Sequence, residues 1–135
     1  MVNRQLCNRL ARIIGGSGSI TNGACVVQTL RKLNVKIFGR RSRSPLTLPF
    51  ALSVEAKDAR SRTLNLGETV ILEREINPFV SELRKRGIKV TAIHNHWLFQ
   101  SRSFKYIHWQ SVGDPVLFAQ KSAAAARAVG ILPRR

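Results

Sequence analysis

Three histidines are the residues of this chain whose types and spacing most clearly suggest chemistry. His94, His96 and His108 are its only histidines, and all three fall within fifteen residues. The segment 88–96 alternates apolar and polar residues as a strand does, so the side chains of His94 and His96 are expected on one face. If the next alternating segment, 104–109, folds back as a hairpin, His94 is predicted to lie directly opposite His108.

Three imidazoles on one sheet face form a ligand set typical of a divalent transition metal, above all zinc. Such a set supplies three nitrogen ligands and leaves a fourth position for water. A metal at this position makes the water acidic near neutral pH, so that it can act as a nucleophile. The histidines therefore predict a metal site and, if the protein is an enzyme, metal-assisted hydrolysis.

An acidic residue is expected to complete this site. Glu68 follows a glycine on an adjoining strand segment, while Glu73 and Glu75 stand at the start of the next helix. Each is a candidate fourth ligand or general base, and Glu68 and Glu75 are the candidate catalytic residues. Two alternatives stay open: packing or hydrogen bonding of the histidines among the nearby aromatic residues, and acid–base chemistry without a metal.

The charge of the chain suggests a different class of function. Its 23 lysines and arginines outnumber 7 acidic residues, which gives a formal net charge of +16. Such a surface attracts anionic partners such as nucleic acid, acidic polymers or anionic lipid. Two clusters could form a polyanion-binding surface, or simply solvated faces: Arg40, Arg41 and Arg43, and Arg84, Lys85, Arg86 and Lys89.

The composition excludes several other classes of protein. Hydrophobic residues make up 44% of the chain, too many for a disordered polycation, and two cysteines are too few for a disulfide-rich scaffold. Cys7 and Cys25 match no zinc motif and are expected to be buried free thiols, since a bridge between them would require an oxidising environment. No signal-like or membrane-spanning run is evident, so we expect a cytoplasmic protein.

The elements that must position these residues follow from periodicity and from turn signals. Apolar spacing predicts a helix over 4–14, stopped by Gly15-Gly16, with 15–19 as a flexible turn. Strands are expected at 25–30, 34–39, 46–56 and 64–72, the last interrupted by Gly67. A second helix is expected to begin between Glu73 and Pro78 with Asn77 as its cap, and a third at Asp114-Pro115.

This order of elements predicts an α+β fold. We expect a single compact domain over residues 1–135, with a mixed or largely antiparallel sheet and about three helices. A structural or assembly protein that uses exposed sheet edges is a third functional possibility.

The residues around the histidines also resemble a known family. The pattern runs from Gly67-Glu68 through Glu75 and Asn77-Pro78 to Thr91-Ala92-Ile93-His94-Asn95-His96 and a later His108. This pattern resembles the LppY/LpqO family of bacterial proteins, in particular its short single-domain members. The resemblance extends over nearly the whole chain and is most specific across residues 64–109. It implies a small bacterial protein with matching residues at the predicted site, but no established activity or cofactor.

Overall fold

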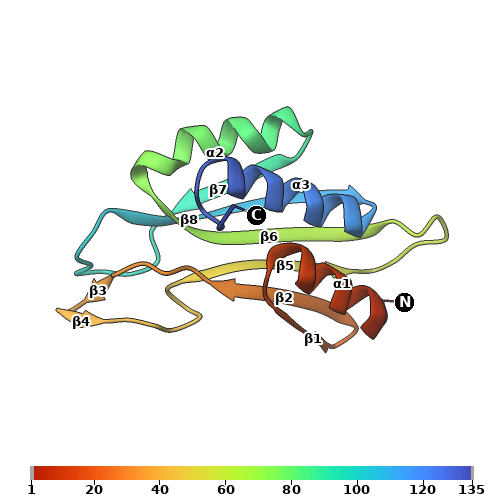
Figure 1. Cartoon of the computed structure of the whole chain (residues 1–135), viewed down its shortest axis with the longest axis horizontal. Helices are drawn as coiled ribbons and strands as arrows, with labels where there is room; N and C mark the ends of the chain where they lie inside the picture. Colours follow the sequence, from red (N-terminus) through yellow and green to blue (C-terminus); the bar gives the residue numbers. More distant parts are fainter. Residues whose placement is uncertain (1, 135) are drawn as a thin grey trace.

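In the computed structural model, which describes residues 2–134, the chain forms three helices and eight strands within that range (Figure 1). The helices are α1 (Arg4–Ile14), α2 (Glu73–Lys85) and α3 (Pro115–Ala128). The strands are β1 (Ser17–Thr21), β2 (Ala24–Leu30), β3 (Lys36–Ile37), β4 (Arg40–Arg41), β5 (Pro49–Glu55), β6 (Thr63–Leu72), β7 (Lys89–His94) and β8 (Phe104–Gly113).

Six of these strands form one sheet in the order β1-β2-β5-β6-β8-β7, and every neighbouring pair is antiparallel. The strands β3 and β4 form a separate small hairpin. The prediction of a single α+β domain with three helices is thus confirmed, and the sheet is antiparallel throughout. Its two edges are β1 and β7.

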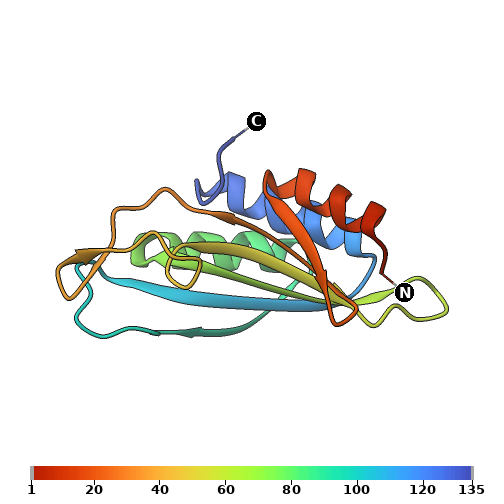
Figure 2. The same cartoon turned by 90° about the horizontal axis from the view of Figure 1, so that it is seen from below.

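One face of the sheet packs against all three helices and carries the main hydrophobic core (Figure 2). Trp109 is at the centre of this core, with its ring edge-on to Phe79 of α2 at a centroid distance of 5.2 Å. Gly67 lies directly opposite Trp109 in the sheet, and a Cβ atom at Gly67 would overlap the indole ring. The glycine therefore makes room for the tryptophan, and β6 continues through it without the predicted interruption.

The opposite face of the sheet is covered at one end only. There Val35 and Leu48, which precede β5, pack on Val70 and Leu72 of β6 and on Tyr106 of β8. Further along this face, the side chains of Glu68, Gln110 and Leu66 are partly or fully exposed. Residues on the uncovered part of this face are therefore accessible to a ligand from solvent.

The start of α2 differs from the prediction. The helix begins at Glu73 with Leu72 as its N-cap, so Asn77 lies inside the helix and the prediction that it caps the helix is wrong. The side chain of Glu75 supplies the cap contact, because its Oε1 accepts a hydrogen bond of 2.8 Å from the Leu72 backbone N–H. By contrast, Asp114 caps α3 with Pro115 in the first turn, as predicted.

A further difference concerns residues 15–19, because the segment expected to be a flexible turn contains most of β1. This strand is joined to β2 by Asn22 and Gly23, whose φ angles of 53° and 78° both fall in the left-handed region. An Asn-Gly pair with two positive φ angles is typical of a tight hairpin turn. The dipeptide was thus the sequence signal that could have revealed β1. In contrast, the strand expected over 34–39 is reduced to the two residues of β3.

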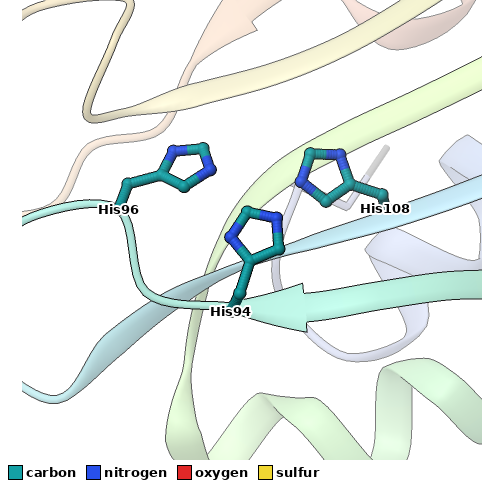
Figure 3. Close-up of side chains that lie close together, drawn as sticks. All are labelled: His94, His96 and His108. Atoms are coloured by element: carbon teal, nitrogen blue, oxygen red, sulfur yellow. The ribbon is translucent and has the colours of Figure 1, made fainter.

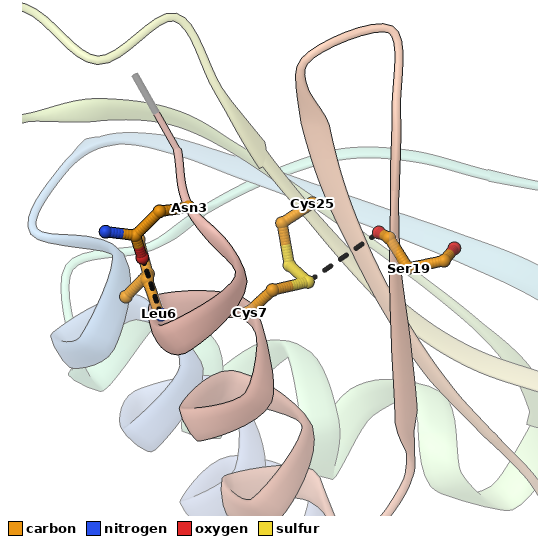
Figure 4. The surroundings of a disulfide bond; sticks show 5 residues. All are labelled: Asn3, Leu6, Cys7, Ser19 and Cys25. Carbon is orange, nitrogen blue, oxygen red and sulfur yellow. Dashed lines mark hydrogen bonds between the residues drawn. A yellow bond between two sulfur atoms is a disulfide. The ribbon is translucent and has the colours of Figure 1, made fainter.

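The prediction of two free thiols is also wrong, because Cys7 and Cys25 form a disulfide (Figure 4). Cys7 lies on the buried side of α1, and Cys25 lies on the face of β2 that α1 covers. The packing of this helix on this strand brings the two sulfur atoms together. Figure 4 also shows Asn3 Oδ1 accepting a hydrogen bond of 2.8 Å from the Leu6 N–H, which caps the start of α1.

Candidate metal centre

The three histidines lie together on the open face of the sheet (Figure 3). Each offers one ring nitrogen, and these three atoms lie within 4.8 Å of one another. His94 is the last residue of β7, His108 lies within β8, and His96 follows two residues after the end of β7. The predicted convergence of the three imidazoles is therefore present in the structure.

The strand register behind this convergence differs from the prediction. His94 lies opposite Tyr106, and His108 lies opposite Ala92. The pairing is displaced by two residues, which keeps both histidines on the same face because side chains alternate with a period of two. Their rings still stack diagonally across the two strands, with centroids 4.9 Å apart and planes inclined by 23°.

His96 is positioned by side-chain stacking rather than by strand pairing. Its ring lies 4.2 Å from the ring of Tyr106, at an interplanar angle of 10°, and 4.5 Å from the ring of His94. The Tyr106 hydroxyl donates a hydrogen bond of 2.9 Å to the Thr47 carbonyl and accepts one of 3.1 Å from Trp97 Nε1. Burial raises the pKa of Tyr106 to about 12, so the phenol stays neutral and forms a fixed platform.

His108 is the most enclosed of the three histidines, and its side chain is 25% exposed. Its Nδ1 lies 3.6 Å from Glu68 Oε1 on the neighbouring strand β6. Its Nε2 is buried and has no hydrogen-bond partner among residues 2–134. Burial lowers the pKa of His108; the charge of Glu68 opposes this shift, and His94 and His96 reinforce it. The neutral imidazole thereby keeps a lone pair available for a metal.

The structure separates the three candidate glutamates. Glu68 lies beside His108, directly opposite it in the sheet. Glu75 is instead buried in a bidentate ion pair with Arg31, with oxygen–nitrogen distances of 2.9 and 2.8 Å. This pair lines a separate cavity of about 580 Å³ that contains none of the histidines. Glu73 is exposed at the start of α2. Only Glu68 is thus brought to the histidine cluster.

The two predicted basic clusters lie in separate parts of the molecule, one at the β3–β4 hairpin and the other at the C-terminal end of α2 (Figures 1 and 2). Arg40 and Arg41 form β4, and Arg43 follows them. The second cluster is at the end of α2 and the start of β7, where Lys85 and Arg86 both form ion pairs with Glu82. The two clusters therefore do not form one continuous surface, and polyanion binding by either cluster stays a prediction.

A comparison with protein-family models finds a match over most of the chain. Residues 8–128 match the model described as Domain of Unknown Function (DUF1259). Neither the curated proteins nor the solved structures include a significant match to this chain. Among the helices of residues 2–134, none has the length and apolar character needed to cross a membrane.

Proposed function

For this chain, which belongs to the family described as Domain of Unknown Function (DUF1259), we propose that the three-histidine cluster binds a divalent transition metal, zinc by preference. The observation that carries the proposal is the convergence of three ring nitrogens, one from each histidine, within 4.8 Å on an accessible sheet face. Because the motif over residues 64–109 includes these histidines, we also propose that the chain is a short member of the LppY/LpqO family.

The donor set fits zinc in number, type and accessibility. Tetrahedral coordination by imidazole nitrogens requires them to lie about 3.3 Å apart, which follows from zinc–nitrogen bonds of about 2.0–2.1 Å. His94 and His96 are exposed, so side-chain rotation can bring their nitrogens closer to the enclosed His108. The buried Nε2 of His108, which lacks a partner among the described residues, is the ligand atom that a metal would satisfy.

Glu68 supports the same site through His108. A carboxylate beside the non-ligating nitrogen of a metal-bound histidine fixes the orientation of the ring and raises its basicity. Glu68 Oε1 lies 3.6 Å from His108 Nδ1, so a small rotation of this partly exposed side chain would bring it within hydrogen-bond distance. In this arrangement His108 would bind the metal through Nε2 and carry its proton on Nδ1, which faces Glu68.

The reaction class that this site supports best is metal-assisted hydrolysis. Three neutral imidazoles leave a coordination position for water and preserve the positive charge of the metal, which lowers the pKa of that water. Glu68 is partly exposed on the same face, with a side chain that is 39% accessible, so its carboxylate can also accept a proton from a nearby water. We therefore assign Glu68 as a positioning residue for His108 and as the candidate general base.

Metal analysis of protein purified without an affinity tag tests this proposal. We expect about one zinc ion per chain by elemental analysis, and a higher melting temperature after zinc is restored to metal-free protein. His94→Ala and His108→Ala should abolish both effects, whereas Glu73→Gln, a change at an exposed glutamate outside the cluster, should preserve them. Metal-free wild-type protein that neither binds zinc in a calorimetric titration nor gains stability from it would refute the proposal.

A panel of chromogenic phosphate and carboxylate esters then tests the reaction class. We expect hydrolysis of at least one ester by zinc-loaded protein, with a reduced kcat in Glu68→Gln. If zinc binds stoichiometrically but no ester is hydrolysed, the metal site stands and the hydrolytic assignment is abandoned.

A further inference from the structure

Four large apolar side chains are exposed on segments at or near one end of the molecule, and we call this group the apolar tip. Its members are Phe38, Leu46, Leu98 and Phe99, which are 71%, 67%, 74% and 70% exposed. Phe38 lies in the turn between β3 and β4, and Leu46 lies in the segment that leads to β5. Leu98 and Phe99 lie between β7 and β8. Figures 1 and 2 show the β3–β4 hairpin and the connection between β7 and β8 side by side at one end of the molecule, while the segment with Leu46 runs from there back to the start of β5.

The apolar tip is held together by specific contacts. The Phe38 N–H donates a hydrogen bond of 3.0 Å to the Phe99 carbonyl, and the Ser101 N–H donates one of 2.8 Å to the Lys36 carbonyl. The rings of Phe38 and Phe99 are in contact, with centroids 4.8 Å apart. A third hydrogen bond, of 3.2 Å, runs from Trp97 Nε1 to the Leu46 carbonyl. These contacts fix the segments that carry the exposed side chains relative to one another.

Both phenylalanines adopt an unfavourable backbone conformation. The φ angles of Phe38 and Phe99 are 53° and 56°, in the left-handed region that bulky residues rarely occupy. Both side chains stay about 70% exposed despite their mutual contact, so burial within the chain does not account for aromatic residues at these positions. Conformational strain of this kind and clustered exposed apolar side chains both concentrate at interaction sites.

The surroundings of the apolar tip are strongly basic. Five exposed cations lie on the segments that carry the tip, which are the chain between β2 and β5 and the connection between β7 and β8. They are Lys36, Arg40, Arg41, Arg43 and Arg102. The sequence contains no aspartate or glutamate between residues 32 and 54 or between residues 83 and 113. None of the five cations forms an ion pair with another residue in the described part of the chain. A partner that covers the tip must therefore be both apolar and anionic.

We propose that the apolar tip docks on the surface of an anionic lipid bilayer. The four apolar side chains enter the boundary between headgroups and acyl chains, while the arginines and lysine remain at the level of the lipid phosphates. This proposal is independent of the metal site and extends beyond the proposed hydrolytic function.

A bilayer fits these residues better than single-stranded nucleic acid does. Leucine side chains such as Leu46 and Leu98 offer no aromatic surface on which a base could stack. The rings of Phe38 and Phe99 already contact one another. Trp97 and Tyr106 are hydrogen-bonded to each other and to backbone carbonyls, and Tyr106 and Phe104 are fully buried. The cations and the aliphatic side chains together therefore favour a lipid surface.

Vesicle co-sedimentation of the full chain tests the proposal. We expect binding to vesicles of phosphatidylglycerol and phosphatidylcholine, and little binding to vesicles of phosphatidylcholine alone. The double variant Phe38→Asn/Phe99→Asn removes both rings, and asparagine tolerates positive φ, so the fold should be preserved. We expect its affinity for the anionic vesicles to fall at least tenfold at a salt concentration that screens non-specific attraction by the charged surface. Arg40→Gln/Arg41→Gln should weaken binding by a similar factor.

Matched variants distinguish this surface from others. Val112→Asn removes an apolar side chain that is 69% exposed on β8, away from the tip, and should bind vesicles as the wild type does. His94→Ala/His108→Ala should also bind normally, which separates this proposal from the metal site. Vesicle binding that is unaffected by Phe38→Asn/Phe99→Asn would overturn the proposal. Wild-type protein that does not bind anionic vesicles would also overturn the proposal, whether or not the protein binds an oligonucleotide.

Discussion

The imidazole of His96 stacks on the phenol ring of Tyr106, with centroids 4.2 Å apart and planes inclined by 10°. Because His96 lies beyond the end of β7, no strand pairing fixes its position. Tyr106 lies on the neighbouring strand β8 and is held by hydrogen bonds with Thr47 and Trp97. The third nitrogen of the candidate metal centre therefore depends on a residue that does not itself bind the metal.

Substitution of Tyr106 tests this dependence. Tyr106→Leu removes the stacking platform, and we expect zinc affinity to fall about tenfold, within the range measured for residues that orient metal ligands. Tyr106→Phe retains the ring but leaves the Thr47 carbonyl without its hydrogen bond. It should bind zinc as the wild type does and lose about 1–2 kcal/mol of stability. Calorimetric zinc titration and denaturant unfolding measure the two effects, and equal zinc affinity in Tyr106→Leu would contradict the assigned role.

Glu68→Gln tests the contact with His108. The substitution preserves size but removes the charge that raises the pKa of His108 against the effect of burial. We expect NMR titration of metal-free protein to show a still lower His108 pKa, and zinc affinity to fall about 10–100-fold. Glu73→Gln is the matched control and should change neither quantity. A zinc affinity of Glu68→Gln within twofold of the wild type would rule out the positioning role.

The buried ion pair between Arg31 and Glu75 predicts a dependence of stability on pH. Burial raises the pKa of Glu75, but hydrogen bonds from Arg31 and Leu72 and the charges of Arg31 and Arg74 outweigh it, so the net shift is downward. The stabilisation by this carboxylate is therefore complete above the ordinary glutamate pKa of about 4.3. It is lost as the pH falls through the lower pKa of the folded state. Unfolding in urea across this acidic range measures the loss.

Variants of this pair separate its role from general acid destabilisation. Glu75→Leu leaves the Arg31 charge buried without its partner and should cost about 3–5 kcal/mol at neutral pH. Arg31→Met/Glu75→Leu should recover most of that loss and flatten the acidic part of the stability profile. Glu82→Gln, which removes the two partly exposed ion pairs that Glu82 forms with Lys85 and Arg86, is the control and should have little effect. If the double variant is as unstable as Glu75→Leu, the loss of stability in Glu75→Leu comes mainly from altered packing and not from the unpaired charge of Arg31.

The disulfide between Cys7 and Cys25 predicts a redox-dependent stability. It closes a loop with a sequence separation of 18 residues, for which chain entropy gives a stabilisation of about 3 kcal/mol. Cys7→Ser/Cys25→Ser should therefore unfold at a lower urea concentration and show no response to dithiothreitol. The wild type should lose a similar amount of stability on reduction, and identical unfolding of the wild type with and without reductant would contradict this prediction.

The redox state of the isolated protein also bears on its compartment. Disulfides persist in oxidising environments and are rare in the reducing cytosol. The cytoplasmic placement expected from the sequence stays a prediction, and thiol labelling of freshly lysed cells would show whether Cys7 and Cys25 are bridged where the protein resides.

Local patterns were sufficient to predict much of the fold. The helix over residues 4–14, the Asp114-Pro115 start of α3 and the strands around β2, β5, β6 and β8 follow from periodicity and capping, which depend on neighbours in the sequence. The same patterns placed His94 and His108 on one face of paired strands. That inference is insensitive to a register error of two residues, and for this reason it was correct although the predicted pairing was not.

Contacts between residues distant in sequence decided the features that local patterns did not predict. Glu75 lies away from the histidine cluster because Arg31, 44 positions away in the chain, pairs with it in the interior. Cys7 and Cys25 became a disulfide through the packing of α1 on β2, and His96 joined the site through its contact with Tyr106. The sequence by itself determined which residue types could form a metal site and on which strands most of them lie. Only the tertiary structure decided which acid joins them, because a side chain's partners in a folded chain are set by packing between elements.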